Sequence, residues 1–297
     1  MTKLSHLASP SATRAVLNKF DLMTKKALGQ HFLVNDDIVR RICELACLSP
    51  ADTVVEVGPG IGTLSIALLQ YARYVIAIER DADLPVVLKE TCSEYHDKFE
   101  VIHKDALDID LKDFSFSPNK LVSNLPYAVA ATIVLDYFER FSSIESATVM
   151  VQAEVADRMC ASVGSKNYGA YTVKLSLFAH THDKFSVSEG NFFPPPRVKS
   201  TVIRLDRNQT EIPQDLINAT VIMADAAFEN RRKNIFNSMK TYFSRQKDDA
   251  SLKLKILNPH EIESLLNQAS ISNTVRGESL SRDQFLNLGK AYLEISN

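Results

Sequence analysis

The chain has 297 residues, of which 45% are hydrophobic and 24% are charged, with a formal net charge of −2. These proportions are average for globular proteins, so the length allows a large and a small domain, each with its own core. No apolar run reaches the roughly 18 residues of a membrane-spanning helix, which excludes a membrane protein and predicts a soluble one.

The N-terminal stretch, from Lys3 to Lys26, is basic. A net charge of −2 does not exclude nucleic-acid binding, because binding depends on where the positive charges lie. We interpret this segment as an ordered basic arm. An organelle transit peptide is the alternative, because the segment is basic and contains Ser and Ala, but it lacks the apolar stretch of a secretory signal. Its cations, set against Asp21, are Lys3, Arg14, Lys19, Lys25 and Lys26.

From residue 53 onward, short β-branched runs alternate with longer helical stretches, a pattern typical of a parallel α/β sheet. Strands are predicted at Thr53–Val57, Tyr74–Glu79, Phe99–His103, Lys120–Ser123 and Ala147–Gln152. Helices are predicted at Gly62–Tyr71, Asp83–Tyr95 and Ala130–Phe141. The runs Lys184–Val187 and Thr201–Leu205 are expected to form the far edge of the sheet.

After residue 205 the strand signals stop. Residues 206–214 are polar and contain Pro213, as in a linker, and the pattern beyond them is amphipathic and helical. The sequence therefore predicts an α/β domain over residues 1–205 and a small all-α domain over residues 206–297. The predicted helices of the second domain are Asp215–Phe228, Asn230–Arg245 and Arg282–Ile295.

The four cysteines, Cys43, Cys47, Cys92 and Cys160, show neither CxxC spacing nor a nearby pair of histidines. We interpret them as free thiols of a reducing compartment rather than as disulfide partners or metal ligands. We therefore expect a cytoplasmic protein without a metal site.

A glycine-rich loop joins the strand Thr53–Val57 to the helix that follows. Gly58, Gly60 and Gly62 suit a strand-to-helix turn with positive φ and a closely approaching ligand, because both exclude side chains. About 20 residues further on, the next strand ends at Glu79, whose carboxylate can accept hydrogen bonds from a ribose diol. Asp105, just past the third strand, can accept one from an adenine amine.

Two cofactors fit such a loop. A nicotinamide cofactor requires the spacing GxGxxG, but the last position of that motif is Thr63 in this chain. The spacing GxGxG favours S-adenosyl-L-methionine, and acidic residues at the next two strand ends support this interpretation.

The sequence Asn124-Leu125-Pro126-Tyr127 follows the fourth strand and is expected to form the acceptor site. It could be an ordinary turn, since Asn and Pro are common in turns. However, the N6 amine of adenine is a poor nucleophile, and two carbonyl acceptors, from the Asn124 side chain and the Leu125 backbone, would favour a pyramidal nitrogen with a free lone pair. Pro126 stiffens the loop, and Tyr127 offers a π face to a flipped base.

Six motifs together resemble the rRNA adenine dimethyltransferase family over nearly the whole chain. They are Lys26–Leu33, Val57–Gly60, Asn124–Tyr127, Phe192–Val198, Phe228–Lys233 and Arg276–Ser281. The resemblance implies a Rossmann-like, S-adenosylmethionine-dependent methyltransferase sheet. It also implies dimethylation of N6 of two adjacent adenines near the 3′ end of 16S rRNA, in an immature small ribosomal subunit. We expect a monomer.

The resemblance also implies roles for individual residues. Cofactor contacts are expected from His31 and Leu33 at the methionine end, Gly58 and Gly60 in the loop, Glu79 at the ribose, Asp105 at the adenine, and Asn124. The expected catalytic residues are Asn124, Leu125, Pro126, Tyr127 and Phe192, with Tyr127 and Phe192 sandwiching the target base while Phe193 belongs to the core. Two positions depart from the family: His31, where many relatives carry Asn, and Ala128, where a polar residue is frequent.

The basic run Arg231-Arg232-Lys233 is interpreted, with Lys25 and Lys26, as a set of RNA phosphate contacts. The alternative is a solvated helix face, which is what such runs usually form.

Three other functions remain open. The related 23S rRNA adenine methyltransferases of macrolide resistance typically have Ile in the tetrad and lack the proline-rich loop, so Leu125 and Pro194–Pro196 disfavour them. A non-catalytic, RNA-binding ribosome-assembly factor is disfavoured by the intact Glu79, Asp105 and Asn124. A nicotinamide oxidoreductase is disfavoured by Thr63.

Overall fold

The computed structural model describes residues 3–23, 30–246 and 255–296. The chain divides into two compact units, residues 1–156 with 181–207, and residues 157–180 with 208–297. The second unit includes residues 157–180, which the sequence analysis placed in the first domain. The reason is packing, because Tyr168 and Val173 are buried in the apolar core of the helical unit.

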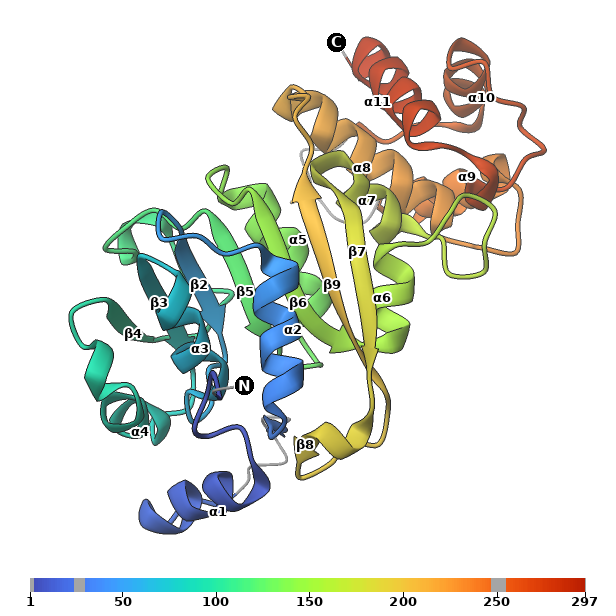
Figure 1. Ribbon diagram of the computed structural model, residues 1–297. Coiled ribbons are helices and arrows are strands. Elements are labelled where there is room, and N and C mark those ends of the chain that lie inside the picture. Colours follow the sequence, from blue (N-terminus) through green and yellow to red (C-terminus); the bar gives the residue numbers. More distant parts are fainter. Residues whose placement is uncertain (1–2, 24–29, 247–254, 297) are drawn as a thin grey trace. The chain divides into compact units, whose positions relative to one another are not determined.

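A seven-stranded mixed sheet forms the first unit, in the order β4-β3-β2-β5-β6-β9-β7, and a two-stranded sheet pairs β1 with β8 (Figure 1). The strands are β1 (Phe32–Leu33), β2 (Thr53–Val57), β3 (Tyr74–Glu79), β4 (Phe99–His103), β5 (Lys120–Asn124), β6 (Ser146–Gln152), β7 (Ala179–Val187), β8 (Phe192–Phe193) and β9 (Ser200–Arg207). The predicted strands are all present, and the predicted α/β fold class is confirmed.

The strand order places a ligand site beside β2. Strands β4, β3, β2, β5 and β6 run parallel, and β9 returns antiparallel to β6. The chain leaves β2 for β3 on one side and later returns to β5 on the other side. Open α/β sheets bind ligands outside the carboxyl ends of the strands at such a reversal of order. The ends of β2 and β5 are Val57 and Asn124.

Helices of ordinary length connect the strands and build the second unit. They are α1 (Pro10–Lys19), α2 (Asp36–Ala46), α3 (Thr63–Tyr71), α4 (Leu84–Thr91), α5 (Ala130–Arg140), α6 (Ala153–Met159), α7 (Ala170–Phe178), α8 (Gln214–Phe228), α9 (Ile235–Gln246), α10 (Pro259–Gln268) and α11 (Arg282–Ser296). Short 3-10 helices lie at Ser93–Tyr95, Leu111–Asp113, Glu189–Asn191 and Gly277–Ser279. No helix among the described residues is long and apolar enough to cross a membrane.

Residues 3–23, the first part of the chain that the structure describes, pack against the rest of the first unit. Leu4 and Leu7 are buried, and the backbone N–H of Ser5 donates to the Asp36 carboxylate over 2.8 Å. Asp36 opens α2, a helix that the sequence analysis did not predict. Its buried residues recur at helical spacing, and Asn35 caps it by accepting from the N–H of Asp37, so the signal was present in the sequence.

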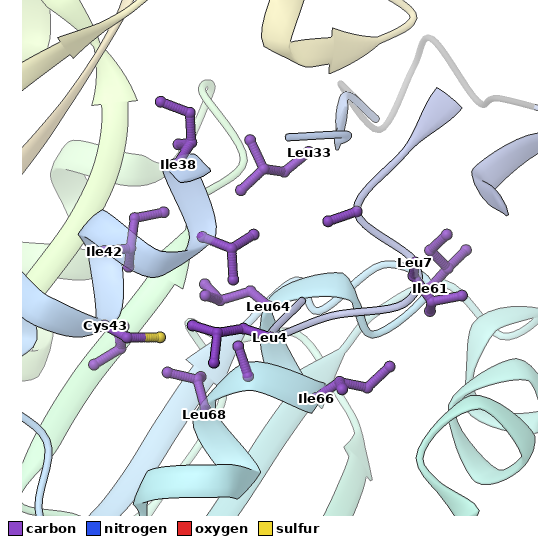
Figure 2. Close-up of a cluster of buried hydrophobic side chains, with 14 of the residues drawn as sticks. Leu4, Leu7, Leu33, Ile38, Ile42, Cys43, Ile61, Leu64, Ile66 and Leu68 are labelled. Carbon is purple, nitrogen blue, oxygen red and sulfur yellow. The ribbon is translucent and has the colours of Figure 1, made fainter. Parts of the chain in front are cut away.

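A single apolar cluster joins these segments to the glycine loop. Figure 2 shows Leu4 and Leu7 of the N-terminal segment together with side chains of α2 and α3. Ile61, in the middle of the glycine loop, is fully buried in the same cluster. Packing of the N-terminal segment, α2 and α3 thus holds the loop that follows β2.

The helical unit has its own core, formed by residues of α7 to α11. Helix α9 begins at Ile235 rather than at the predicted Asn230, because Asn234 accepts a hydrogen bond from the N–H of Asn237 at the start of the helix. Arg231, Arg232 and Lys233 therefore lie in a loop before α9 and not on a helix face.

Candidate active site

A cavity of about 500 Å³ lies at the carboxyl ends of β2, β3 and β5 and beside β1. It brings together residues that are far apart in the sequence. Its lining includes His31, Leu33, Gly58, Gly60, Glu79, Asp105, Asn124, Leu125, Pro126 and Tyr127. All residues predicted to contact the cofactor, and the whole predicted tetrad, therefore face one cavity.

The glycine loop lines the cavity with a backbone in conformations that side chains disfavour. Gly58 and Gly60 have φ of +67° and +60°, and a Cβ on Gly60 would lie 3.0 Å from the Phe32 ring. Gly62 begins α3 without a side-chain cap. The first N–H groups of α3 consequently have no capping side chain, which suits a polar or anionic ligand.

Thr63, the residue whose position disfavours a nicotinamide cofactor, also has a buried hydroxyl group without a hydrogen-bond partner among the described residues. The residue lines the cavity and is 4% exposed, and the oxygen of this hydroxyl is Oγ1. A buried hydroxyl without a partner is costly, so this atom indicates a ligand group at this side of the cavity.

Glu79 ends β3 with its carboxylate almost fully buried, at 7% exposure. Burial raises the pKa of its carboxyl, and backbone N–H groups of Asp81, Gly60 and Arg80 partly offset the rise. The Asp81 N–H donates to Oε1 over 2.7 Å. These donors hold the carboxylate in one orientation at the edge of the cavity.

Asp105 is less buried and already has two partners. Its Oδ2 lies 3.1 Å from Nη1 of Arg80, and its Oδ1 accepts from the N–H of Leu107 over 3.1 Å. Arg80 also lines the cavity. Arg80, the residue after Glu79 in the sequence, therefore links the end of β3 to Asp105 by an ion pair.

Glu56 is a cavity residue that the sequence analysis missed. It lies in the interior of β2 and is 1% exposed. Burial raises the pKa of its carboxyl to about 8, the Ser65 hydroxyl lowers it by donating to Oε2 over 2.6 Å, and the Glu79 carboxylate raises it. A glutamate in an otherwise β-branched strand was the signal that could have found it.

Asn124 is held by a bond to the start of β1. Its Nδ2 donates to the carbonyl oxygen of His31 over 3.2 Å, which leaves Oδ1 as an acceptor. The next residue, Leu125, is buried, and its N–H donates to the Met150 carbonyl oxygen over 3.1 Å. Among the described residues, none donates to the carbonyl oxygen of Leu125. The two acceptors expected from the sequence thus belong to adjacent, fixed residues.

Tyr127 is fixed at both ends of its side chain. Its hydroxyl lies 2.7 Å from Oγ of the buried Ser200, and its ring stacks on the His31 ring with 5.8 Å between centroids and 25° between planes. The Nδ1 of His31 lies 2.8 Å from the carbonyl oxygen of Pro194. Because a carbonyl oxygen can only accept, Nδ1 of His31 carries the proton.

Phe192 does not take the predicted position. It is 3% exposed, belongs to the apolar cluster of the first unit and does not line the cavity, whereas Phe193 is only partly buried, with the Arg14 guanidinium 5.0 Å from its ring centroid. The antiparallel pairing of β8 with β1 sets Phe192 opposite the buried Leu33. Phe192 therefore lies outside the cavity in this structure, and its stacking on the target base stays a prediction. Phe193 packs against the same apolar cluster while remaining partly exposed, which agrees in part with its core assignment.

The predicted RNA contacts fall in two places. Lys25 and Lys26 lie outside the described residues. Arg231, Arg232 and Lys233 are exposed in the helical unit, and Arg231 is bound by the Glu278 carboxylate over 3.2 Å and by the Ser165 carbonyl oxygen over 3.3 Å. Arg232 and Lys233 form no ion pair within the part of the chain that the structure describes.

Comparisons with known proteins agree with the geometry. The sequence model of the family described as ribosomal RNA adenine dimethylase matches residues 22–275. The ribosomal RNA small subunit methyltransferase A of Natranaerobius thermophilus is 35% identical, over 96% of this chain and 97% of that protein. This chain belongs to the ribosomal RNA adenine dimethylase family. The family predicted from the motifs is thereby confirmed, and so is the enzyme class, an S-adenosylmethionine-dependent rRNA adenine dimethyltransferase.

Solved structures share the fold of this dimethylase. A dimethyladenosine transferase from Plasmodium falciparum has a TM-score of 0.72 at 24% identity, over 90% of this chain and 98% of that chain. The 23S rRNA methyltransferase ErmE has a TM-score of 0.64 at 25% identity, over 88% of this chain and 99% of that chain. Both likenesses cover most of the chain, so they include the helical unit as well as the sheet.

Proposed function

We propose that this protein transfers methyl groups from S-adenosyl-L-methionine to N6 of two adjacent adenines near the 3′ end of 16S rRNA, in an immature small ribosomal subunit. The observation that carries the proposal is the single cavity that joins the glycine loop, Glu79 and Asp105 to the tetrad Asn124–Tyr127. One part of the cavity suits a nucleoside with a charged tail, and the other suits a planar base with an amine.

The residues present fit the cofactor. The backbone of Gly58 and Gly60 lines the cavity, and the buried Thr63 hydroxyl lacks a partner among the described residues. The Glu79 carboxylate is fixed at the strand end where a ribose diol can bind. We infer that Asp105 accepts from the adenine amine and that His31 and Leu33 border the methionine end. When bound, S-adenosyl-L-methionine supplies an electrophilic methyl group on a positively charged sulfur.

The tetrad prepares the amine for attack. Oδ1 of Asn124 and the carbonyl oxygen of Leu125 accept the two N6 hydrogens, which withdraws the nitrogen lone pair from the purine ring. Tyr127, held by Ser200 and His31, provides a fixed face for the base after it leaves its stack. The bound cofactor would supply the methyl group to N6, and the N6 proton would be released to water. Positioning supplies most of the rate enhancement.

The RNA is held mainly through its phosphates. We infer that Arg232 and Lys233, which are exposed and form no ion pair with described residues, make phosphate contacts together with Arg231 and with the basic residues Lys25 and Lys26. Such contacts are independent of sequence, so the selection of the two adenines lies in the cavity and in the shape of the subunit. We propose a cytoplasmic monomer that acts during subunit biogenesis.

The alternative substrate, 23S rRNA, is less well supported. The relative named for the small subunit is 35% identical to this chain, against 25% for the 23S rRNA methyltransferase ErmE. A purely structural assembly factor would not need the buried Glu79 carboxylate or the oriented Asn124 amide at one cavity.

The proposal is tested by incubating the protein and S-adenosyl-L-methionine with immature small subunits that lack the modification. Digestion of the rRNA and mass mapping should locate two dimethylated adenines near the 3′ end of 16S rRNA. Large subunits treated in the same way are the control. Methylation of 23S rRNA alone, or cofactor binding without methylation of either RNA, would contradict the proposal.

A further inference from the structure

His31 touches three parts of the acceptor site that come from distant segments. Its Nδ1–H donates to the carbonyl oxygen of Pro194, its ring stacks on Tyr127, and its own carbonyl oxygen accepts from Nδ2 of Asn124. The first and last of these bonds join residues separated by 163 and 93 positions in the sequence. One residue therefore links the loop after β8, the aromatic face and the amide.

The bond to Asn124 decides which end of the amide is free. An amide rotated by 180° would place Oδ1 against the His31 carbonyl oxygen, and two acceptors do not bond. The observed orientation requires the His31 backbone to stay where it is. Residues 32 and 33 hold it from one side through the pairing of β1 with β8, and the Nδ1–Pro194 bond holds it through the side chain.

We propose that His31 is a positioning residue for methyl transfer, which fixes the Asn124 amide and the Tyr127 ring before the base enters. This role is separate from contact with the methionine end of the cofactor, and it rests on the proposed transfer to an adenine amine. Two features of the side chain provide this positioning: the donor at Nδ1 and the flat ring. The role therefore predicts a loss of rate at saturating ligands, whereas a cofactor contact predicts a loss of affinity.

Three variants separate the two anchors. His31→Asn keeps an N–H at the same number of bonds from Cα as Nδ1 but removes the ring, His31→Phe keeps a ring but removes the donor, and His31→Ala removes both. The matched control is His96→Ala, since Nδ1 of His96 also contacts a backbone carbonyl, that of Ser93 over 3.3 Å, but on an exposed residue outside the cavity.

The measurement is single-turnover methylation at saturating cofactor and subunits, with calorimetry for cofactor affinity and thermal melts for folding. We expect His31→Ala to lower the rate about tenfold to a hundredfold, because the loss of positioning and the loss of one hydrogen bond act together. The dissociation constant of the cofactor should change less than the rate. His31→Asn should recover more of the rate than His31→Phe, and His96→Ala should match the wild type.

A double-mutant cycle tests whether His31 acts through Asn124. If it does, His31→Ala should cost little additional rate in a protein that already carries Asn124→Ala, because the amide it positions is gone. Additive losses would overturn the proposal. So would a normal saturated rate in His31→Ala, or a loss confined to cofactor affinity. If His31→Ala does not fold, the same cycle is run with His31→Phe.

The wild type separates this inference from the proposed function. If the wild type does not methylate 16S rRNA, the proposed function itself is wrong. If the wild type is active but substitution of His31 does not change the rate, only the proposed positioning role of His31 is wrong.

Discussion

The proposed chemistry depends on the orientation of the Asn124 side chain. Its Nδ2 is bonded to His31, so its oxygen is available to an incoming amine. The benefit of this acceptor grows as the amine nitrogen becomes pyramidal, and it therefore belongs to the transition state rather than to the bound substrate.

We predict that Asn124→Ala slows methyl transfer far more than it weakens RNA binding. Removal of one preorganised hydrogen-bonding group lowers the rate about a hundredfold to a thousandfold, while phosphate contacts dominate RNA affinity. Single-turnover methylation measures the first effect, and RNA titration measures the second. A folded variant with a near-normal rate would refute this role, and equal damage to rate, folding and both ligands would indicate that Asn124 only shapes the turn.

Glu79→Ala is predicted to weaken cofactor binding about tenfold to a hundredfold, since a charged hydrogen bond contributes roughly 1.5–3 kcal/mol. The buried position of Glu79 and its bond from the Asp81 N–H fix the carboxylate for the ribose diol. Calorimetry gives the dissociation constant. The exposed Glu94, replaced by Ala, is the control. An unchanged dissociation constant in folded Glu79→Ala would remove Glu79 from the cofactor site.

A buried hydrogen bond joins strand β2 to helix α3 beneath the glycine loop. The Ser65 hydroxyl of α3 donates to Glu56 of β2, and both residues are almost inaccessible to solvent. Because burial raises the pKa of Glu56 to about 8, this carboxyl carries a proton over much of the neutral range. The glycine loop, proposed to bind the cofactor, therefore lies above a carboxyl group that titrates.

Glu56→Gln should change how the stability of the protein depends on pH. The folded state binds the Glu56 proton more tightly than the unfolded chain, whose carboxyl titrates near 4.5. Its contribution to stability is therefore complete below that pKa and is lost as the pH rises to about 8. Glutamine keeps an acceptor for Ser65 but does not titrate, so the variant should gain on the wild type by up to about 1.4 kcal/mol per pH unit in this window.

Urea unfolding of the cofactor-free protein from about pH 5 to about pH 9 measures this difference. The raised pKa of Glu79 acts in the same direction and remains in both proteins. The difference between the two proteins therefore reports Glu56 together with its interaction with the Glu79 carboxylate. Glu94→Gln, on an exposed residue, should show no such trend. A constant difference in unfolding free energy between Glu56→Gln and the wild type would show that Glu56 is ionised in the folded protein.

The proposed function assigns the chemistry to the unit built on the sheet and part of the RNA binding to the helical unit. The cavity belongs entirely to the unit built on the sheet, while the loop before α9 presents three cations on the helical unit. With a net charge of only −2 for the whole chain, the distribution of charge matters more than its sum.

Replacement of Arg231, Arg232 and Lys233 by Ala should weaken RNA binding and flatten its salt dependence. Removal of one cation from a phosphate reduces the log–log slope by about 0.7 to 0.9. Because Glu278 and the Ser165 carbonyl oxygen already bind Arg231, we expect Arg232 and Lys233 to account for most of the change.

Binding isotherms at several salt concentrations give the slope. The control is replacement of Lys240 and Lys290, two exposed cations of the same helical unit, which should leave the slope closer to that of the wild type. If the triple variant remains as salt-sensitive as the wild type, the loop does not contact phosphates.

The sequence alone determined the sheet, the glycine loop and the family. Strands β2, β3 and β4 have the bounds that the sequence predicted, because strand propensity is a property of short local segments. The loop Gly58–Gly62 could be predicted equally well, since a positive φ favours glycine over other residue types. Cofactor and tetrad residues follow strand ends, so their convergence on one cavity could be expected from the topology.

Only the tertiary structure decided the contacts between distant segments. Phe192 is buried and Phe193 is partly exposed because β8 pairs with β1 in one register, and a shift of one residue would exchange the two faces. The coupling of His31 to Asn124, and the assignment of residues 157–180 to the helical unit, likewise depend on packing across long separations in the sequence. Local patterns fix which face of an element is apolar, but the partner of that face is chosen by the burial of the whole chain.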